Sequence, residues 1–155
     1  MTIAINHSAS LKPVGKPTTK ENQMLHDTNA DQKSVAASTT EDVFGHHLSC
    51  FRKGDLSGLM EDYDSQAKFF TPNGILRGST AIREFFSTLL EEFEKPGLSF
   101  ERLREDIEGN TAYLVWKADT ADNRYEFATD TFVLQNGKIV TQTFAGKIVP
   151  KRQPR

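Results

Sequence analysis

The spacing of apolar side chains changes at Pro96-Gly97, and this change limits the folds that the chain can adopt. Before this dipeptide, apolar residues recur every three or four positions, which is the spacing of one face of a helix. After it, apolar and polar residues alternate, as they do in a strand with one buried face. Helices followed by a meander of strands indicate an α+β domain.

The first predicted helix has a signal at each end. Thr39 or Thr40 can cap it, and Glu41 and Asp42 place negative charge in its first turn. Gly54 is expected to end it, because glycine readily adopts the left-handed conformation of a helix C-cap. The apolar stripe of this helix consists of Phe44, His47, Leu48 and Phe51.

Two more helices are expected before the spacing changes. Asp55 can cap the second helix, and Ser79 can cap the third, which should end at Pro96-Gly97. Between them, residues 67–78 read AKFFTPNGILRG, which predicts a strand, a tight turn and a second strand. The third helix has the longest stripe, formed by Ile82, Phe85, Phe86, Leu89, Leu90 and Phe93.

Four strands are predicted after Pro96, over residues 98–107, 112–118, 124–134 and 138–149, the first with an irregularity near residues 101–103. Gly109-Asn110 and Asn136-Gly137 supply hairpin turns between them. The last strand should carry a face formed by Val140, Gln142, Phe144 and Ile148. A curved sheet wrapped around a long helix leaves a cone, and the open end of a cone is a natural apolar pocket.

The aromatic residues divide the chain into a tail and a domain. All of them lie after Glu41, and the preceding residues are rich in Ser, Thr, Asn, Lys and Ala. Such a segment buries too little apolar surface to offset the entropy of ordering. We therefore predict a disordered tail over residues 1–38, a domain over residues 39–149 and a frayed end over residues 150–155.

Composition argues against several classes of partner. The formal net charge of the chain is −2, and neither tail nor domain has a basic patch, so no nucleic acid is expected to bind. No apolar run approaches the roughly 20 residues of a membrane span, and the first residues lack the apolar core of a secretory signal. Cys50 is the only cysteine, which excludes an internal disulfide and suits a reducing compartment. We therefore predict a cytoplasmic protein.

Metal and cofactor sites are not expected either. His46 and His47 are adjacent, so their side chains point about 100° apart on a helix and cannot readily chelate one ion. No group of Cys, His and Asp residues has metal-ligand spacing, and there is no glycine-rich phosphate loop. The sequence thus predicts a site that works without metal or cofactor.

Four separated segments carry a resemblance to a known family: Gly54-Asp55-Leu56, AKFFTPNG, LRGSTAIREFF and TDTFVLQNGKIVTQTF. In this order they resemble the NTF2-like superfamily, and within it the SnoaL-like and ketosteroid-isomerase-like group, over residues 41–148. The resemblance implies a cystatin/NTF2-like fold, in which a strongly curved, mostly antiparallel sheet wraps around three N-terminal helices. This fold hosts isomerases, cyclases, dehydratases, epoxide hydrolases and binding modules. We expect a homodimer formed through the sheet.

The resemblance also places individual residues. Ketosteroid isomerases use an Asp base and an oxyanion hole made of a Tyr and a protonated Asp. A gapless alignment on the Gly-Asp pair puts His47 in the place of that tyrosine, Thr71 in the place of the base and Asp130 in the place of the oxyanion-hole acid. Tyr63 and Phe86 fall where some members have further tyrosines. A threonine hydroxyl is a poor base near neutral pH, so ordinary ketosteroid isomerisation is disfavoured.

His47 and Asp130 are the candidate catalytic residues. His47 interrupts an apolar helical stripe, and Asp130 alternates with apolar residues on a strand face, so each needs a polar partner. One interpretation is structural: the two side chains pair and tie helix to sheet, or His47 bonds to the backbone. The other is catalytic, because a pocket histidine near a carboxylate can act as a general acid or base near neutral pH.

A further set of residues is predicted to line a ligand pocket: Tyr63, Thr71, Phe85, Trp116, Phe132 and Phe144. Aromatic residues at these spacings more often form an ordinary core, and the cone of the resembled fold is what supports the pocket interpretation. We expect a protein that binds an apolar small molecule. The alternative is a cofactor-independent isomerase, cyclase or dehydratase that acts on a polyketide- or steroid-like carbonyl compound through His47 and Asp130. The sequence leaves open whether the protein is an enzyme.

Overall fold

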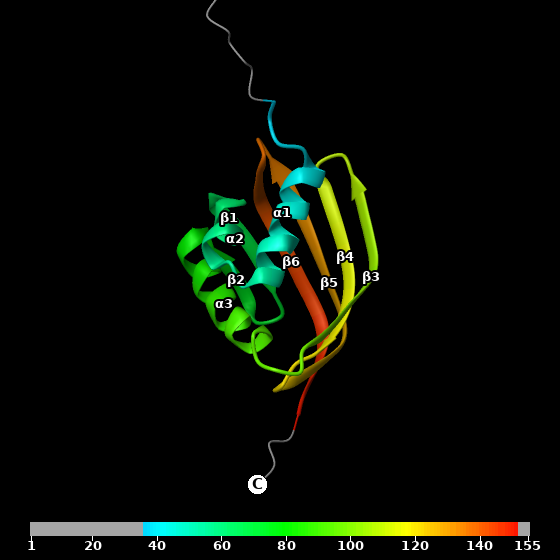
Figure 1. Ribbon diagram of the computed structural model, residues 1–155. Coiled ribbons are helices and arrows are strands. Elements are labelled where there is room, and N and C mark those ends of the chain that lie inside the picture. Colours follow the sequence, from blue (N-terminus) through cyan, green and yellow to red (C-terminus); the bar gives the residue numbers. More distant parts are fainter. Residues whose placement is uncertain (1–35, 152–155) are drawn as a thin grey trace, which may run out of the picture. The chain divides into compact units, whose positions relative to one another are not determined.

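In the computed structural model, which describes residues 36–151, three helices lie against one face of a six-stranded sheet (Figure 1). The elements are α1 (Thr40–Lys53), α2 (Leu56–Glu61), β1 (Tyr63–Thr71), β2 (Gly74–Arg77), α3 (Gly78–Phe93), β3 (Ser99–Glu108), β4 (Thr111–Asp119), β5 (Asn123–Gln135) and β6 (Lys138–Pro150). This order confirms the predicted α+β class. Nearly all of the predicted tail lies outside the described residues, as do residues 152–155.

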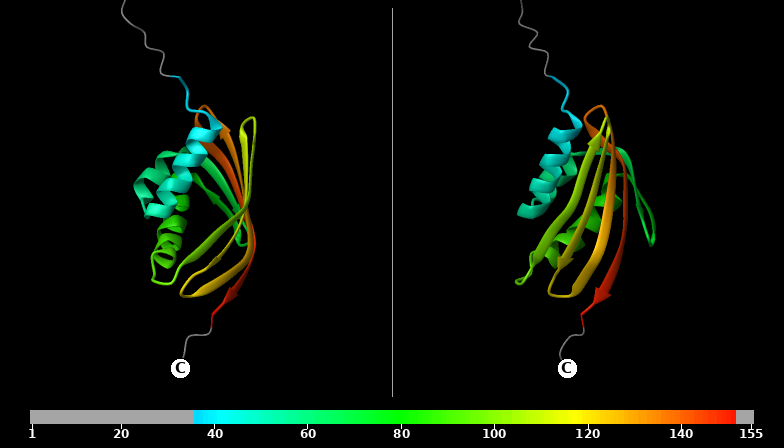
Figure 2. Two further views of the ribbon diagram at one scale, coloured as in Figure 1. Left: turned by 45° about the vertical axis from the view of Figure 1, so that its right-hand side comes forward. Right: turned by 90° about the vertical axis from the view of Figure 1, so that its right-hand side faces the viewer.

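The strand order in the sheet is β2-β1-β6-β5-β4-β3. All neighbours are antiparallel except β1 and β6, which run parallel. The sheet curves around the helices, which occupy its concave side (Figure 2). The mostly antiparallel, curved arrangement is the one that the resemblance implied.

The caps of α1 and α2 are those predicted. The Thr39 side chain accepts a hydrogen bond from the Asp42 backbone N–H, and the Asp42 side chain accepts one from the Thr39 backbone. This reciprocal capping box satisfies two helix N–H groups that would otherwise lack partners. Gly54 ends α1 with a φ of 68°, and the Asp55 side chain caps α2.

The predicted cap of α3 is wrong. The helix begins at Gly78, and Arg77 occupies the cap position without a side-chain hydrogen bond. Ser79 already lies inside the first turn, because β2 runs up to Arg77 and Gly78 makes the turn into the helix with a φ of 81°. The helix also ends at Phe93, a few residues before the Pro96-Gly97 pair that was expected to stop it.

Bulges give the sheet part of its curvature. The register shifts between Arg102 and Arg104 in β3, at the place where the sequence predicts an irregularity. In β6, Leu134 pairs with Ile139 and Val133 with Thr141, so Val140 is an extra, bulged residue. Val140 therefore does not continue the face of Gln142, as the simple alternation predicted, and the buried residue at this end of β6 is Ile139.

The core lies between the concave face of the sheet and the helices. Its largest fully buried apolar side chains are Phe44, Leu59, Phe69, Ile82 and Ile139. Burying an apolar side chain of this size stabilises the fold by about 1.5–3 kcal/mol. No helix among residues 36–151 is long and apolar enough to cross a membrane.

Candidate active site

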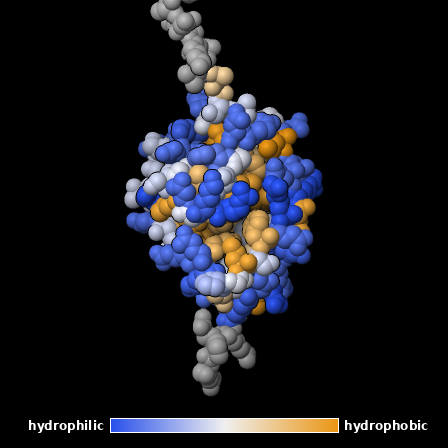
Figure 3. Space-filling view, in the orientation of Figure 1, coloured by the Kyte–Doolittle hydropathy of each residue, from blue (hydrophilic) through white to orange (hydrophobic). Residues whose placement is uncertain are grey.

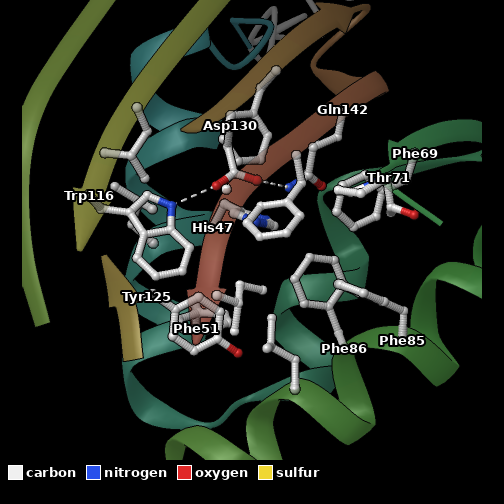
Figure 4. Close-up of a pocket in the computed structure, with 18 of the residues that line it drawn as sticks. His47, Phe51, Phe69, Thr71, Phe85, Phe86, Trp116, Tyr125, Asp130 and Gln142 are labelled. Atoms are coloured by element: carbon white, nitrogen blue, oxygen red, sulfur yellow. Dashed lines mark hydrogen bonds between the residues drawn. The ribbon is translucent and has the colours of Figure 1, made fainter. Parts of the chain in front are cut away.

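A cavity of about 370 Å³ lies between α1, α3 and the concave face of the sheet (Figure 4). Its volume is at the lower end of the range of roughly 300–1,000 Å³ that is usual for small-molecule sites. Most of the wall is apolar, and the aromatic members include Phe51, Phe69, Phe85, Phe86, Trp116 and Phe132. The apolar lining residues Phe100 and Ile148 remain 46% and 41% exposed, so they lie at the mouth. Apolar side chains reach the surface between helices and sheet, with polar side chains around them (Figure 3).

The structure brings most of the predicted ligand-binding residues to this cavity. Its lining includes Thr71, Phe85, Trp116, Phe132 and Phe144. Tyr63 is the predicted residue that does not line the cavity. Its buried hydroxyl donates a hydrogen bond to Gln142, which does line the cavity. Tyr63 thus supports the wall from behind.

Thr71 lies at the rim, where β1 ends at the turn into β2. Its hydroxyl donates to the Gly74 carbonyl oxygen at 3.0 Å and accepts from the Asn73 backbone N–H at 3.2 Å. Both bonds are local, so the hydroxyl shapes the turn. This explains a threonine at the end of an apolar strand without assigning it chemistry.

Asp130 is buried at the inner end of the cavity and is held by two neighbouring strands. Its carboxylate accepts hydrogen bonds from Trp116 Nε1 at 2.8 Å and from Gln142 Nε2 at 2.9 Å. Burial raises the pKa of Asp130 above its ordinary value, while the two hydrogen bonds and the nearby His47 oppose that rise. A carboxyl group in this setting favours the neutral acid more than an exposed aspartate does.

His47 reaches the same cavity from α1, and its side chain is only 3% exposed. The ring packs edge-on against Tyr63, Phe86 and Phe132, with centroids 5.5, 5.9 and 5.1 Å away. Its Nδ1 atom lies 3.7 Å from Oδ2 of Asp62, at the junction of α2 and β1. His47 and Asp130 therefore converge on one cavity, as predicted from their faces.

The structural interpretation expected His47 to pair with Asp130. The hydrogen bonds of the Asp130 carboxylate come instead from Trp116 and Gln142. Asp130 stands opposite Leu114 of β4 and Phe144 of β6. Trp116 follows Leu114 by two residues and Gln142 precedes Phe144 by two, which makes both of them diagonal neighbours of Asp130 on the same face. Both hydrogen bonds of the Asp130 carboxylate are therefore made within the sheet, to the two strands beside β5.

Sequence reasoning missed two polar residues of the site. Gln142 carried a usable signal, since it was placed on an otherwise apolar face of the last strand. Asp62 carried none, because it stands in an acidic run, Glu61 to Asp64, that resembles a solvated linker. It is nevertheless buried, at 7% exposure. Within residues 36–151, no three Cys, His, Asp or Glu side chains lie close enough to hold a metal ion.

The arrangement has the elements of acid–base chemistry. A buried carboxyl whose pKa is raised can, when protonated, donate a hydrogen bond to a carbonyl oxygen, and an imidazole nitrogen in the same apolar space can accept a proton from a bound molecule. Residues 44–142, more than half of the chain, match the family model of the SnoaL-like domain. The chain belongs to the SnoaL-like family. Comparison with curated proteins gave no match.

Solved structures show that this SnoaL-like chain has the NTF2-like fold. An NTF2-like protein of unknown function from Cytophaga hutchinsonii superposes with a TM-score of 0.60 at 15% identity, over 70% of this chain and 90% of that one. The epoxide hydrolase/cyclase-like enzyme SalBIII, which takes part in pyran ring formation in the polyether salinomycin, gives 0.60 at 16% identity, with 70% and 90% covered. A proposed ketosteroid isomerase from Kribbella flavida gives 0.58 at 13% identity, with 77% and 87% covered.

Proposed function

We propose that the protein binds an apolar small molecule in the cavity between α1, α3 and the sheet. The observation that carries this proposal is the cavity itself, an aromatic-lined space of about 370 Å³ with one buried carboxyl at its inner end. Apolar walls with a few convergent polar groups are the usual composition of small-molecule sites. A flat, neutral molecule with one hydrogen-bonding oxygen fits this composition best.

Binding is measurable with a neutral naphthyl ketone whose fluorescence depends on polarity. Trp116 is the only tryptophan of the chain and lines the cavity, so energy transfer from it reports a bound probe. Ile148→Glu should weaken probe binding by about tenfold, because it puts a charge at the apolar mouth.

Val149→Glu is the matched control. Val149 neighbours Ile148 on β6 and is similarly exposed, at 39% against 41%, yet it does not line the cavity. It should leave the affinity for the probe unchanged. Equal losses in the two variants, or no binding to the unmodified protein, contradict the assignment of the cavity as a binding site.

A second candidate is cofactor-independent acid–base catalysis on a polyketide- or steroid-like carbonyl compound. The observation that favours it is the convergence of His47 with an Asp130 whose pKa is raised by burial. The structural neighbours described as a cyclase-like enzyme and as a proposed ketosteroid isomerase support this class of reaction. Neutral Asp130 would donate a hydrogen bond to the carbonyl oxygen as it becomes an enolate, and His47 would remove the α-proton and return it.

Deuterium exchange at the α-carbon of such ketones tests the second candidate. His47→Gln and Asp130→Asn should each lower the exchange rate by about 10²–10⁴-fold, which is the usual contribution of a positioned acid or base. Glu126→Gln, on the same strand as Asp130 but exposed, is the matched charge control. Full exchange in both cavity variants contradicts the catalytic roles, and an unmodified protein that exchanges no faster than buffer leaves binding as the function.

The homodimer through the sheet and the cytoplasmic location remain predictions.

A further inference from the structure

Two buried polar atoms face each other beside the cavity without a hydrogen-bond partner. Within the described residues, His47 Nδ1 and Asp62 Oδ2 are the only buried side-chain nitrogen or oxygen atoms that have no hydrogen-bond partner. They lie 3.7 Å apart, just beyond hydrogen-bond distance. A buried polar atom without a partner costs about 1–3 kcal/mol, so a native protein that keeps two of them side by side needs a reason.

The other oxygen of Asp62 is firmly held. Oδ1 lies 2.8 Å from Nδ1 of His46, whose side chain is 47% exposed. The backbone N–H of Ile139 donates to the Asp62 carbonyl oxygen at 2.7 Å, which ties this residue to β6. Asp62 is therefore a fixed carboxylate between a half-exposed histidine and a buried one, although the two histidines are adjacent in sequence.

The orientation of His47 leaves one ring nitrogen for the cavity. Nδ1 is buried and faces Asp62, so Nε2, on the far side of the ring, is the nitrogen that a molecule in the cavity can reach. For Nε2 to accept a proton, the neutral ring must carry its own proton on Nδ1. A carboxylate facing Nδ1 favours that tautomer, because it can accept a hydrogen bond and has none to donate.

We propose that Asp62 is a positioning residue, which holds His47 in the tautomer protonated on Nδ1 and leaves Nε2 as the base that faces the cavity, while His46 anchors the Asp62 carboxylate. This inference rests on the acid–base function proposed above and supplies the partner that His47 lacks in Asp130. A contraction of a few tenths of an ångström completes the hydrogen bond, as is common when a catalytic site closes on its ligand.

Other ionisable groups also lie near His47 and His46. Asp130 faces His47 from β5, and the Tyr63 hydroxyl lies behind the wall with its pKa raised by burial and by the charges of Asp130 and Asp62. Cys50 Sγ is 3.4 Å from His46 Nε2. Burial, followed by the charges of acidic neighbours that include Asp62, raises the pKa of the Cys50 thiol. Among these groups, Asp62 is the carboxylate that faces Nδ1 of both histidines.

Nitrogen-15 NMR of the histidine rings in the full chain tests the proposal without any ligand. The unmodified protein should show His47 protonated on Nδ1 at neutral pH, with His47→Gln used to assign its signals. Asp62→Asn should move that proton to Nε2, because an asparagine amide can donate to Nδ1. Asp64→Asn, the same change two residues later in the chain and at the start of β1, should leave the tautomer as it is.

A turnover measurement complements the spectrum. Asp62→Asn should lower α-carbon exchange by about 10²–10⁴-fold, since an imidazole in the wrong tautomer cannot act as base. Binding of the naphthyl ketone should persist, because Asp62 does not line the cavity.

The outcomes are distinguishable from those of the proposed function. His47 protonated on Nε2 in the unmodified protein, or a tautomer that Asp62→Asn does not change, overturns the positioning role. The Nδ1 tautomer in a protein that exchanges no α-protons supports the role of Asp62 and contradicts the acid–base function.

Discussion

Asp130→Leu is expected to lower the free energy of unfolding by about 2–5 kcal/mol, because it leaves two buried donors without an acceptor. The donors are Trp116 Nε1 and Gln142 Nε2, which bond to the two carboxylate oxygens at 2.8 and 2.9 Å. Leucine has a similar size, so the loss reports hydrogen bonding more than packing. Urea unfolding followed by Trp116 fluorescence measures it.

Asp130→Asn should cost less, because asparagine keeps one acceptor oxygen for one of the two donors. If the side-chain NH2 group of the new asparagine faces Gln142, two donors stand opposite each other. The side-chain amide of Gln142 then has to rotate so that its oxygen accepts from the new NH2 group. In the unmodified protein the Tyr63 hydroxyl donates to the side-chain oxygen of Gln142, and that rotation would remove this acceptor. If the leucine and asparagine variants lose equal stability, the hydrogen-bond chain Tyr63–Gln142–Asp130–Trp116 is not what holds the site.

The same residue should give stability a pH dependence of definite sign. Burial raises the pKa of Asp130 in the folded state above its ordinary value of 3.8. Between that value and the raised one, the folded protein binds more protons than the unfolded chain, so the contribution of this group to stability falls as pH rises. Both Asp130 variants should lack this decline when unfolding is repeated from pH 3.8 to neutrality. A decline of equal size in all three proteins contradicts the raised pKa.

Phe86→Ala is expected to cost about 3–5 kcal/mol, as for other large-to-small changes of buried aromatic residues. Phe86 is 3% exposed on α3. Its ring lies 5.4–6.4 Å from the ring centres of a set of neighbours: His47, Phe51, Tyr63, Phe69 and Phe85. Its removal therefore leaves a void where both helices meet the sheet.

Phe127→Ala is the control for this change. Phe127 is 50% exposed on β5, so its truncation should stay within about 0.5 kcal/mol. Urea unfolding of the two variants gives the comparison. A loss in Phe86→Ala as small as that in Phe127→Ala contradicts the view that this ring fastens α3 to the sheet.

The fold could be predicted because its signals are local. Thr39, Asp55 and Gly54 act on backbone groups within one or two turns, so their caps were confirmed. Ser79 was placed wrongly for a tertiary reason: β2 pairs with β1 up to Arg77, so the helix starts directly after the strand and Arg77, still extended, takes the cap position. Val140 shows the same limit, because a bulge depends on the partner strand.

The site was only partly predictable. Alternation along one strand places Asp130 on the concave face, and helical spacing places His47 among apolar residues, so both candidates were found. Their hydrogen-bond partners depend on the register between β4, β5 and β6 and on the contact between α1 and the α2–β1 junction. These relations join residues far apart in the chain, and no local pattern encodes them.

The sequence by itself determined the α+β class, the caps of α1 and α2, the hairpin turns and the inward faces of His47 and Asp130, since each follows from a periodicity or a backbone preference. Tertiary structure alone decided that Asp130 bonds to Trp116 and Gln142, and that Asp62 faces His47. A side chain's orientation is set by its own element, whereas its partner is set by how elements pack.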